Sequence, residues 1–194
     1  MKYRCTWCND DPISREYHDN EWGKPLHDEQ GLFEMLTLEG AQAGLSWTTV
    51  LKKRPAYREL FYEFDIEKVA SMSDALLEKI LLNSAIIRNR LKVYSTRGNA
   101  LATLKLIEEY GSLDHYLWNW IDHTPIVNNW NSSSEIPSTT PLAETISKDL
   151  NKRGFGFVGP TIMYAFMQGV GMIDDHLVDC FIRKNSTPTT KGFG

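Results

Sequence analysis

Apolar residues recur at helical spacing along most of the chain. The clearest case begins at Asp28, which with the two residues after it suits the first turn of a helix, because acidic and capping side chains stabilise that end. One face of this predicted helix is then formed by Leu32, Met35, Leu36 and Glu39. The pattern therefore places an acid, Glu39, on the face that is expected to meet the core.

A buried carboxylate is costly unless it has a partner or a chemical role, so Glu39 has two interpretations. It either pairs with a nearby cation in the core or serves as the acid of a binding pocket. The residues after it, GAQAGLSWTTVLKKR (40–54), combine a run of small residues, a tryptophan and three basic residues. Helical spacing alone does not choose between the two interpretations.

The same spacing predicts further helices between chain breakers. They run from Ser46 to a break near Pro55, over 57–64, from Ser73 to Leu81, from Ile86 to about Glu109, from Pro141 to Lys152, and onward from Pro160. The stretch 122–141 is rich in Asn, Ser, Thr and Pro and is the main predicted loop. Strand-like alternation is scarce, so the sequence predicts an all-α fold.

The composition suits one compact helical domain, or two lobes that share a core, because 42% of the 194 residues are hydrophobic and 24% are charged. No apolar run reaches membrane-spanning length, and the first residues, MKYRCTWCND, lack the apolar region of a signal peptide. We therefore expect a cytoplasmic protein without membrane contact. Three cysteines are too few for a disulfide framework, which favours free thiols or metal ligands.

The formal net charge of −4 counts against a dedicated nucleic-acid binder, which is usually basic. Local patches matter more than the total, however, and basic residues cluster at 52–54, 88–97 and 148–153. A solvated helix face is the simpler interpretation of any one cluster. The charge therefore leaves DNA binding open.

Cysteine and histidine residues recur near both ends of the chain. Cys5 and His18 lie near the N-terminus, and His176 and Cys180 lie near the C-terminus at i, i+4, which predicts that both point from one helix face. Two thiolates and two imidazoles make a closed tetrahedral set that suits a structural zinc ion. Cys8 complicates the choice, because Cys5 and Cys8 form a C-x-x-C pair. Ordinary buried thiols and hydrogen-bonded histidines are the alternative to a metal site.

The stretch LLNSAIIRNRLKV (81–93) reads as a helix end, a short turn and a helix start that carries Arg88, Arg90 and Lys92. Two helices joined by a tight turn can point backbone amides and a helix N-terminus at a phosphate, and nearby cations add affinity. All-α proteins contain many helix–helix connections, so this hairpin alone does not indicate DNA binding.

Long blocks of the chain resemble the 3-methyladenine DNA glycosylase I family, within the helix-hairpin-helix glycosylase superfamily. The resemblance runs from about Cys5 to Cys180. Its strongest blocks are YHDNEWG (17–23), LFEMLTLEGAQAGLSWTTVLKKR (32–54), SEIPSTT (134–140) and KRGFGFVGPTIMYAFMQGVGMIDDHLVDC (152–180). The resemblance implies a single two-lobed helical domain over 1–182, with a structural zinc ion that clips the terminal segments together through Cys5, His18, His176 and Cys180. The segment 183–194 lies outside it and is expected to be a polar tail.

The resemblance also implies an activity, the excision of 3-methyladenine from alkylated double-stranded DNA by hydrolysis of the N-glycosidic bond. Glu39 matches the pocket acid of the family and Tyr17 its pocket tyrosine, so these two are the expected catalytic residues. Trp47 matches the stacking aromatic, and Trp22 is expected to form a neighbouring wall of the base pocket. The family acts without strand cleavage, so no lyase activity is expected. The enzyme is expected to work as a monomer that releases the free base.

The hairpin departs from the family pattern, because Ala85 and Leu91 stand where glycines are usual. Alanine does not readily adopt a positive φ, so the turn is expected to have a different shape. The segment QAGLS (42–46) is the expected tip that enters the duplex, with Gly44 allowing close approach and Leu45 acting as an apolar wedge.

The predicted pocket suits a cationic base. Methylation at N3 leaves the attached adenine positively charged, and electron-rich rings attract such a base by roughly 0.5 to 2 kcal/mol. A carboxylate complements the charge and steadies an oxocarbenium-like transition state. Two rival functions are a broader alkylpurine glycosylase and a non-catalytic, zinc-containing helical DNA-binding module.

Overall fold

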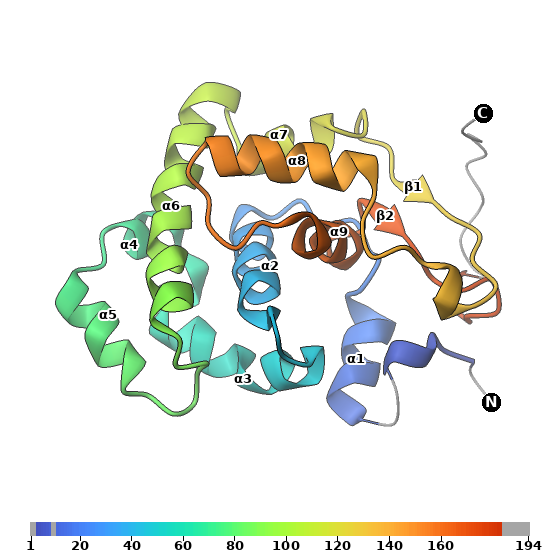
Figure 1. Ribbon diagram of the computed structural model, residues 1–194, viewed down its shortest axis with the longest axis horizontal. Coiled ribbons are helices and arrows are strands. Elements are labelled where there is room, and N and C mark those ends of the chain that lie inside the picture. Colours follow the sequence, from blue (N-terminus) through green and yellow to red (C-terminus); the bar gives the residue numbers. More distant parts are fainter. Residues whose placement is uncertain (1–2, 9–10, 184–194) are drawn as a thin grey trace.

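The computed structural model describes residues 3–8 and 11–183, and helices make up most of it (Figure 1). The elements, in chain order, are η1 (Thr6–Cys8), α1 (Pro12–Asn20), α2 (Glu29–Gln42), α3 (Trp47–Leu60), η2 (Tyr62–Phe64), α4 (Ile66–Ala70), α5 (Asp74–Leu81), α6 (Arg90–Tyr110), α7 (Leu113–Asn119), β1 (Ile126–Val127), η3 (Ser133–Glu135), α8 (Pro141–Lys152), α9 (Pro160–Gly169) and β2 (Ile173–Asp174). The predicted helical fold is confirmed. The two short strands pair in parallel and are its one addition within the described residues.

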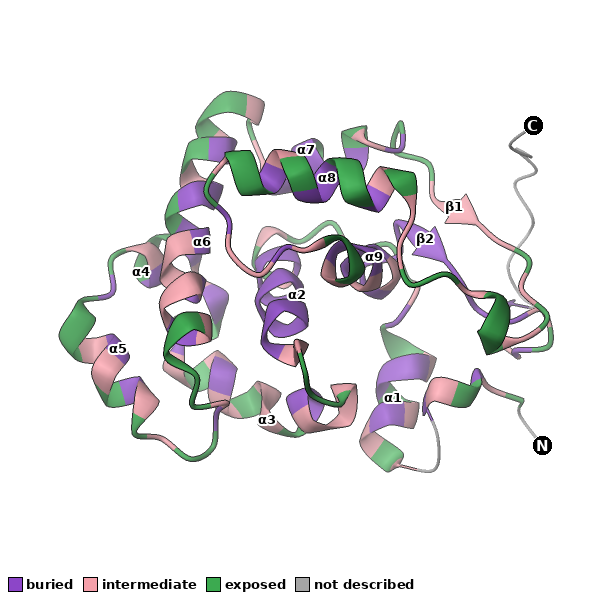
Figure 2. Cartoon of the chain, viewed as in Figure 1, coloured by how far each residue is buried: buried purple, intermediate pink, exposed green. Residues whose placement is uncertain are grey.

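Helix α2 lies in the middle of the molecule, where it contacts α3, α6, α7 and α9. Every residue from 32 to 41 is buried, so the helix is enclosed on all sides (Figure 2). Its position therefore explains the burial of Glu39 better than the apolar face seen in the sequence does. A second acid of the same helix, Glu34, is buried as well.

The predicted starts of three helices are confirmed, and each has a capping side chain. Asp28, Ser46 and Ser73 each accept a hydrogen bond from the backbone N–H three residues further on, at 2.7, 3.2 and 3.3 Å. Such bonds satisfy N–H groups that have no partner within the helix, which stabilises each first turn. These local contacts require no tertiary structure, which is why the sequence predicts them well.

Two predicted boundaries are wrong. Helix α3 does not break near Pro55 but continues to Leu60. Proline removes one helical hydrogen bond, yet Leu51 and Tyr57 on either side of it are buried, and this packing outweighs the loss. Helix α6 begins at Arg90 and not at Ile86, because the Asn89 side chain caps it.

The hairpin of α5 and α6 is confirmed, and its turn is compatible with alanine. The N–H of Ala85 donates to Oδ1 of Asn83 at 2.8 Å, and Ala85 keeps a negative φ. Leu91 lies in the first turn of α6, where it is 71% exposed and needs no glycine-like backbone. The departure from the family's glycine pattern therefore causes no strain at these two positions.

The segments near the two ends of the chain lie side by side. The N–H of Phe181 donates to the carbonyl oxygen of Tyr3 at 2.9 Å, and that of Leu177 lies 3.4 Å from Sγ of Cys5. Arg183, where the polar tail was predicted to begin, is buried and donates to Asn129 at 2.7 Å. The rest of that predicted tail, 184–194, lies outside the described residues. No helix within the described ranges is long and apolar enough to span a bilayer.

Candidate active site

Two buried glutamates on α2 have opposite surroundings. Glu34 accepts hydrogen bonds from Nε of Arg54 and from Nε of Arg58, both at 2.7 Å. Burial alone would raise its pKa, but the hydrogen bonds from Arg58 and then Arg54 hold the pKa of Glu34 below its usual value. Glu34 is therefore an ionised acid in a well-partnered core ion pair.

Glu39 has no such partner. Its side chain is 5% exposed and makes no hydrogen bond or ion pair with the described residues. Burial raises the pKa of its carboxyl group from the ordinary value of 4.5 to about 8. The core ion pair that one interpretation placed at Glu39 is formed by Glu34 instead. An unpaired buried acid of this kind is a frequent mark of a functional site.

Tyr17 of α1 approaches the same place as Glu39. The ring is buried and its hydroxyl has no hydrogen-bond partner among the described residues. A Cβ built on Gly169 would lie 3.1 Å from the Tyr17 hydroxyl and 3.5 Å from Oε1 of Glu39. Burial, and then the charge of Glu39, raises the pKa of the Tyr17 phenol well above its usual range. The two predicted catalytic groups are thus brought together beside the end of α9.

Further aromatic rings pack against Tyr17. Trp47, the first residue of α3, lies 5.3 Å from Tyr17 between ring centroids. Trp7 of η1 lies 6.2 Å from Tyr17 and 5.0 Å from Trp22. The indole N–H groups of Trp7 and Trp47 are buried without a hydrogen-bond partner in the described part of the chain. Sequence reasoning missed Trp7, because it stands in a short 3-10 turn between two cysteines and carries no helical periodicity.

Trp22 is separated from Tyr17 by the ring of Trp7, which contacts both. No ring contact joins Trp22 and Tyr17 among the described residues; instead, Trp22 packs between Trp7 and the two histidines near the chain ends. It supports the pocket through Trp7 and reaches His176 at 4.6 Å between ring centroids. The expected wall residue therefore connects the pocket to the predicted metal site.

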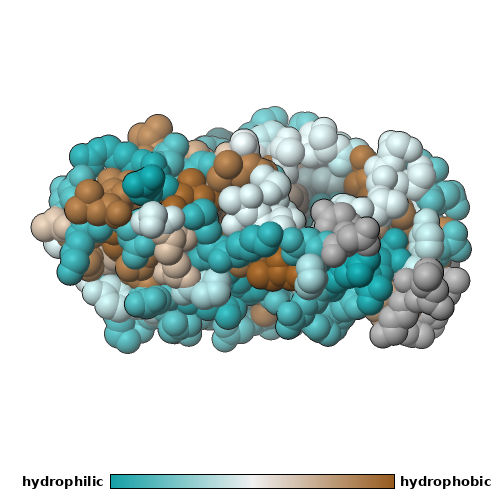
Figure 3. All heavy atoms as spheres, turned by 90° about the horizontal axis from the view of Figure 1, so that it is seen from below, coloured by the Kyte–Doolittle hydropathy of each residue, from teal (hydrophilic) through white to brown (hydrophobic). Residues whose placement is uncertain are grey.

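The loop between α2 and α3 carries the predicted wedge. Gly44 has φ +78°, a left-handed value that glycine tolerates, and a Cβ there would meet nothing within 4 Å. Leu45 is 38% exposed beside it. The face of the molecule seen from below is mostly hydrophilic, with hydrophobic residues gathered in patches (Figure 3). An exposed leucine at a loop tip is suited to enter a neighbouring molecule.

The basic residues of the hairpin differ in whether their charged groups already have partners within the protein. Arg88 is exposed and makes no hydrogen bond or ion pair with the described residues. Arg90 pairs with Glu78, and its guanidinium lies 5.2 Å from the centre of the Tyr94 ring. Lys92 donates to two backbone carbonyls at the end of α2. Of these three cations, Arg88 is the best placed to meet a phosphate.

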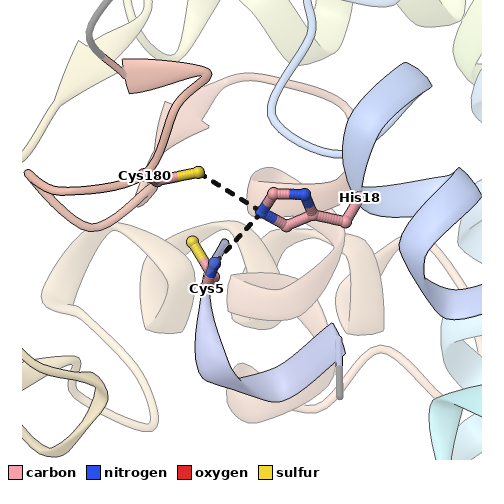
Figure 4. A group of neighbouring side chains, drawn as sticks. All are labelled: Cys5, His18 and Cys180. Carbon is pink, nitrogen blue, oxygen red and sulfur yellow. Dashed lines mark hydrogen bonds between the residues drawn. The ribbon is translucent and has the colours of Figure 1, made fainter. Parts of the chain in front are cut away.

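Three of the four predicted metal ligands form a buried cluster (Figure 4). Sγ of Cys5, Nε2 of His18 and Sγ of Cys180 all lie within 4.8 Å of one another. A hydrogen bond from Cys5, and then one with His18, lowers the pKa of the Cys180 thiol well below its usual range. Cys8 lies apart, with its thiol donating to the carbonyl oxygen of Cys5 at 3.1 Å.

The fourth predicted ligand, His176, lies next to the cluster. Its ring centroid is 5.1 Å from that of His18, and its buried Nε2 has no hydrogen-bond partner among the described residues. Each histidine has a carboxylate at Nδ1: Asp19 lies 2.9 Å from His18, and Asp174 lies 2.8 Å from His176. Carboxylates behind imidazoles are typical of metal-binding histidines, because they fix the ring and leave Nε2 for the metal.

The prediction that His176 and Cys180 share a helix face is wrong, because both lie in the irregular segment after β2. The fully buried carboxylate of Asp175 fixes that segment by accepting hydrogen bonds from Asn128, Trp130 and Gln168, each at 2.7 Å. Tertiary hydrogen bonds thus hold a loop where spacing predicted a helix.

The fold and the site together define a class of protein. A helical fold brings an unpaired acid, Glu39, next to Tyr17, whose ring contacts Trp47 and Trp7, and an acid beside electron-rich rings suits a flat, positively charged ring. An exposed wedge and a basic hairpin accompany the pocket. These are the parts expected of an enzyme that draws a base out of DNA.

Comparison with known proteins identifies the family. The sequence profile named Methyladenine glycosylase matches residues 7–184. DNA-3-methyladenine glycosylase 1 of Escherichia coli (strain K12) is 45% identical over 185 residues, which cover 95% of this chain and 99% of that protein. The structure of 3-methyladenine DNA glycosylase I from Staphylococcus aureus has a TM-score of 0.91 at 36% identity, covering 95% of this chain and 98% of that one. The chain belongs to the methyladenine glycosylase family.

Another relative bears on the ligand. A variant of 3-methyladenine DNA glycosylase I has been solved in complex with 3-methyladenine, with a TM-score of 0.90 at 36% identity, covering 93% of this chain and 97% of that one. Together, these matches confirm the family resemblance seen in the sequence.

The pKa of Glu39 predicts a pH-dependent cost to stability. Between about 4.5 and about 8 the unfolded chain ionises this carboxyl while the folded chain keeps its proton, so the free energy of unfolding falls as pH rises. Glu39→Gln removes this titration and should gain stability relative to the wild type by on the order of a few kcal/mol across the window. Chemical denaturation at several pH values measures the difference.

Glu34→Gln is the matched control on the same helix. The lowered pKa of Glu34 stabilises the fold above the pKa of the unfolded chain, and this contribution is lost in acid. The control should therefore destabilise most at neutral pH and least in acid. A difference between wild type and Glu39→Gln that stays constant with pH would contradict the assignment of an unpaired acid at Glu39.

Proposed function

We propose that this chain is an enzyme that excises 3-methyladenine from alkylated DNA by hydrolysing the N-glycosidic bond. The observation that carries the proposal is the unpaired carboxyl group of Glu39, which lies beside Gly169 together with the hydroxyl of Tyr17, whose ring contacts Trp47 and Trp7. Relatives that match nearly the whole chain in sequence or in structure are named for this activity.

The substrate helps the reaction. An adenine methylated at N3 is cationic while attached to the sugar and leaves as a neutral base, so it needs less acid assistance than a normal purine. The enzyme's main tasks are then to extract the base and to refuse neutral adenine. The rings of Trp47 and Tyr17 favour the cation by roughly 0.5 to 2 kcal/mol.

Glu39 adds charge selectivity. With a pKa of about 8 it is mostly protonated at neutral pH when no cation is near. A cationic base in the pocket favours the ionised carboxylate, which then accepts hydrogen bonds from the exocyclic amino group. Neutral adenine offers no such compensation for an ionised acid. We rank this recognition first and the stabilisation of the oxocarbenium-like transition state second.

Extraction of the base involves the loop and the hairpin. Gly44 allows the loop to approach the duplex closely, and Leu45 fills the gap that the flipped base leaves. Arg88 and the backbone of the hairpin hold the phosphates, while Arg90 contributes charge from its pair with Glu78. We infer simple hydrolysis without a lyase step, since none of the residues assigned to the pocket is a lysine that could form a Schiff base.

We further infer that Cys5, His18, His176 and Cys180 hold a structural zinc ion. Two thiols and two imidazoles are the donor set of closed zinc sites. The unpartnered Nε2 of His176 and the carboxylates at both Nδ1 atoms support this set. The metal would hold the two ends of the chain together and leave no position for a reacting water. Action as a monomer in the cytoplasm stays a prediction.

The released-base assay tests the proposed function. Methylated DNA is incubated with the protein, and the released bases are identified by chromatography. Free 3-methyladenine should appear in clear excess. Release mainly of 7-methylguanine would indicate a broader alkylpurine glycosylase, and no released base would leave a DNA-binding module.

Glu39→Gln should lower the excision rate about tenfold or more while the protein stays folded, because the neutral amide cannot complement the cation. Single-turnover kinetics on methylated DNA measure the rate, and circular dichroism and metal analysis check the fold. Wild-type excision by this variant would exclude Glu39 from the pocket.

Cys180→Ser should lower both zinc content and thermal stability, because a structural metal contributes folding free energy. Cys8→Ser is the matched control, since Cys8 is a buried thiol outside the cluster. Elemental analysis and thermal unfolding compare the two variants. Equal zinc content in both would rule out the proposed ligand set.

A further inference from the structure

Lys92 links the DNA-facing hairpin to the wedge loop. It stands in the first turn of α6, directly after the hairpin turn, and its half-buried side chain crosses to the end of α2. There Nζ donates to the carbonyl oxygens of Ala41 at 2.8 Å and Ala43 at 2.6 Å. The ammonium group therefore already has two partners inside the protein, whereas Arg88 on the same hairpin has none among the described residues.

The carbonyl groups of Ala41 and Ala43 lie at the C-terminal end of α2, where hydrogen-bond donors are lacking within the helix. The last carbonyls of a helix have no intrahelical partner and carry the negative end of its dipole. The neighbouring carbonyls are satisfied within the chain segment itself: Gly40 accepts from the N–H of Ala43, and Gln42 accepts from the N–H of Leu45. Lys92 provides the two remaining donors, so all carbonyls from 40 to 43 are bonded.

The rest of the loop is held locally. Nε2 of Gln42 donates to the carbonyl oxygen of Leu45 at 2.6 Å, and Ser46 caps α3. Gly44 lies between the residues that make these hydrogen bonds, and a Cβ built on it would meet nothing within 4 Å. The bonds from Lys92 thus join this loop directly to the start of α6, 49 and 51 positions further along the chain. Lys53 of α3 separately donates to the carbonyl oxygen of Ser84 in the hairpin turn at 3.0 Å.

We propose that Lys92 is a positioning residue for the wedge Leu45 and does not bind a phosphate. The proposal rests on the proposed function, in which the hairpin holds the duplex while Leu45 fills the gap left by the flipped base. The two elements must then reach one duplex at a fixed separation. Lys92 sets that separation by tying the start of α6 to the carbonyls that precede Gly44.

Removal of this tie should loosen the loop without unfolding the protein, because α2 and α6 also pack against each other. A displaced wedge lowers the rate of the step that needs it, and small misplacements have large effects on rate. Binding to DNA through the hairpin remains. The effect should therefore fall on kcat and not on KM.

A double-mutant cycle tests the proposal. Lys92→Met should lower kcat about tenfold with KM changed less than about twofold, and Lys92→Arg, which keeps donors, should recover most of the rate. In a Leu45→Ala background, Lys92→Met should lower kcat less than about twofold, because the group it positions is absent. The non-additivity distinguishes positioning of Leu45 from a general loss of structure.

Salt dependence separates positioning from phosphate binding. Removing one cation that binds a phosphate makes the slope of log affinity against log salt concentration less steep by about 1. Lys92→Met should leave this slope unchanged, whereas Arg88→Met, the matched control on the same hairpin, should reduce it. A reduced slope for Lys92→Met together with additive effects of Lys92 and Leu45 would overturn the proposal.

Two further measurements keep the outcomes distinct. Binding of free 3-methyladenine, followed by tryptophan fluorescence, should be unchanged in Lys92→Met, which shows that the pocket is intact. If Lys92→Met does not fold, Gln42→Ala is used instead, because it removes the hydrogen bond from the Gln42 side chain to the carbonyl oxygen of Leu45. This variant should lower kcat in the wild-type background but much less in the Leu45→Ala background. Additive effects of the two substitutions would then overturn the proposal. A wild-type protein that releases no 3-methyladenine refutes the proposed function, whereas an active wild type with an unaffected Lys92→Met refutes only the role of Lys92.

Discussion

The burial of one unpaired carboxyl group, that of Glu39, is the constraint on which the rest of the site depends. A central helix enclosed by its neighbours leaves Glu39 only 5% exposed and without a cationic partner among the described residues. Its raised pKa is the direct result. The fold supports such an unfavourable group because the helix is stabilised elsewhere, by the ion pairs of Glu34 and by packing along its whole length. A positively charged ligand bound beside Glu39 would supply the counter-charge that the protein does not provide.

The proposed base pocket and the cluster of Cys5, His18 and Cys180 are parts of one arrangement. Tyr17 and His18 are consecutive residues of α1, so one helix presents a phenol to the pocket and an imidazole to the cluster. Trp22 and Trp7 continue the contact from the histidines to the pocket rings. With a zinc ion holding the terminal segments, the aromatic wall contributed by the N-terminal turn would be fixed as well. A metal remote from the reacting atoms can matter to the pocket in this way.

Much of the fold could be predicted from local signals. Capping side chains such as Asp28, Ser46 and Ser73 mark helix starts because their hydrogen bonds span three residues. Errors arose where distant packing decided the outcome, as when α3 passes through Pro55. Spacing alone singled out Glu39 and the set of cysteines and histidines, but it left an alternative interpretation open for each. Family resemblance supplied Tyr17 and Trp47 and chose Cys5 over Cys8, but it did not supply Trp7. The basic hairpin suggested phosphate binding by Lys92, whose ammonium is bonded to α2.

The sequence by itself determined the helices, the hairpin and the chemical types of the site residues, because these follow from spacing and from contacts within a few positions. It could not determine which acid of α2 is paired. Glu34 and Glu39 are chemically identical, and only the approach of α3 gives the first two arginines and the second none. The same holds for His176 and Cys180, which converge on the N-terminal turn through loop hydrogen bonds and not through a helix. Contacts between residues far apart in the chain decide ionisation, and so tertiary structure decided which glutamate is available to a ligand.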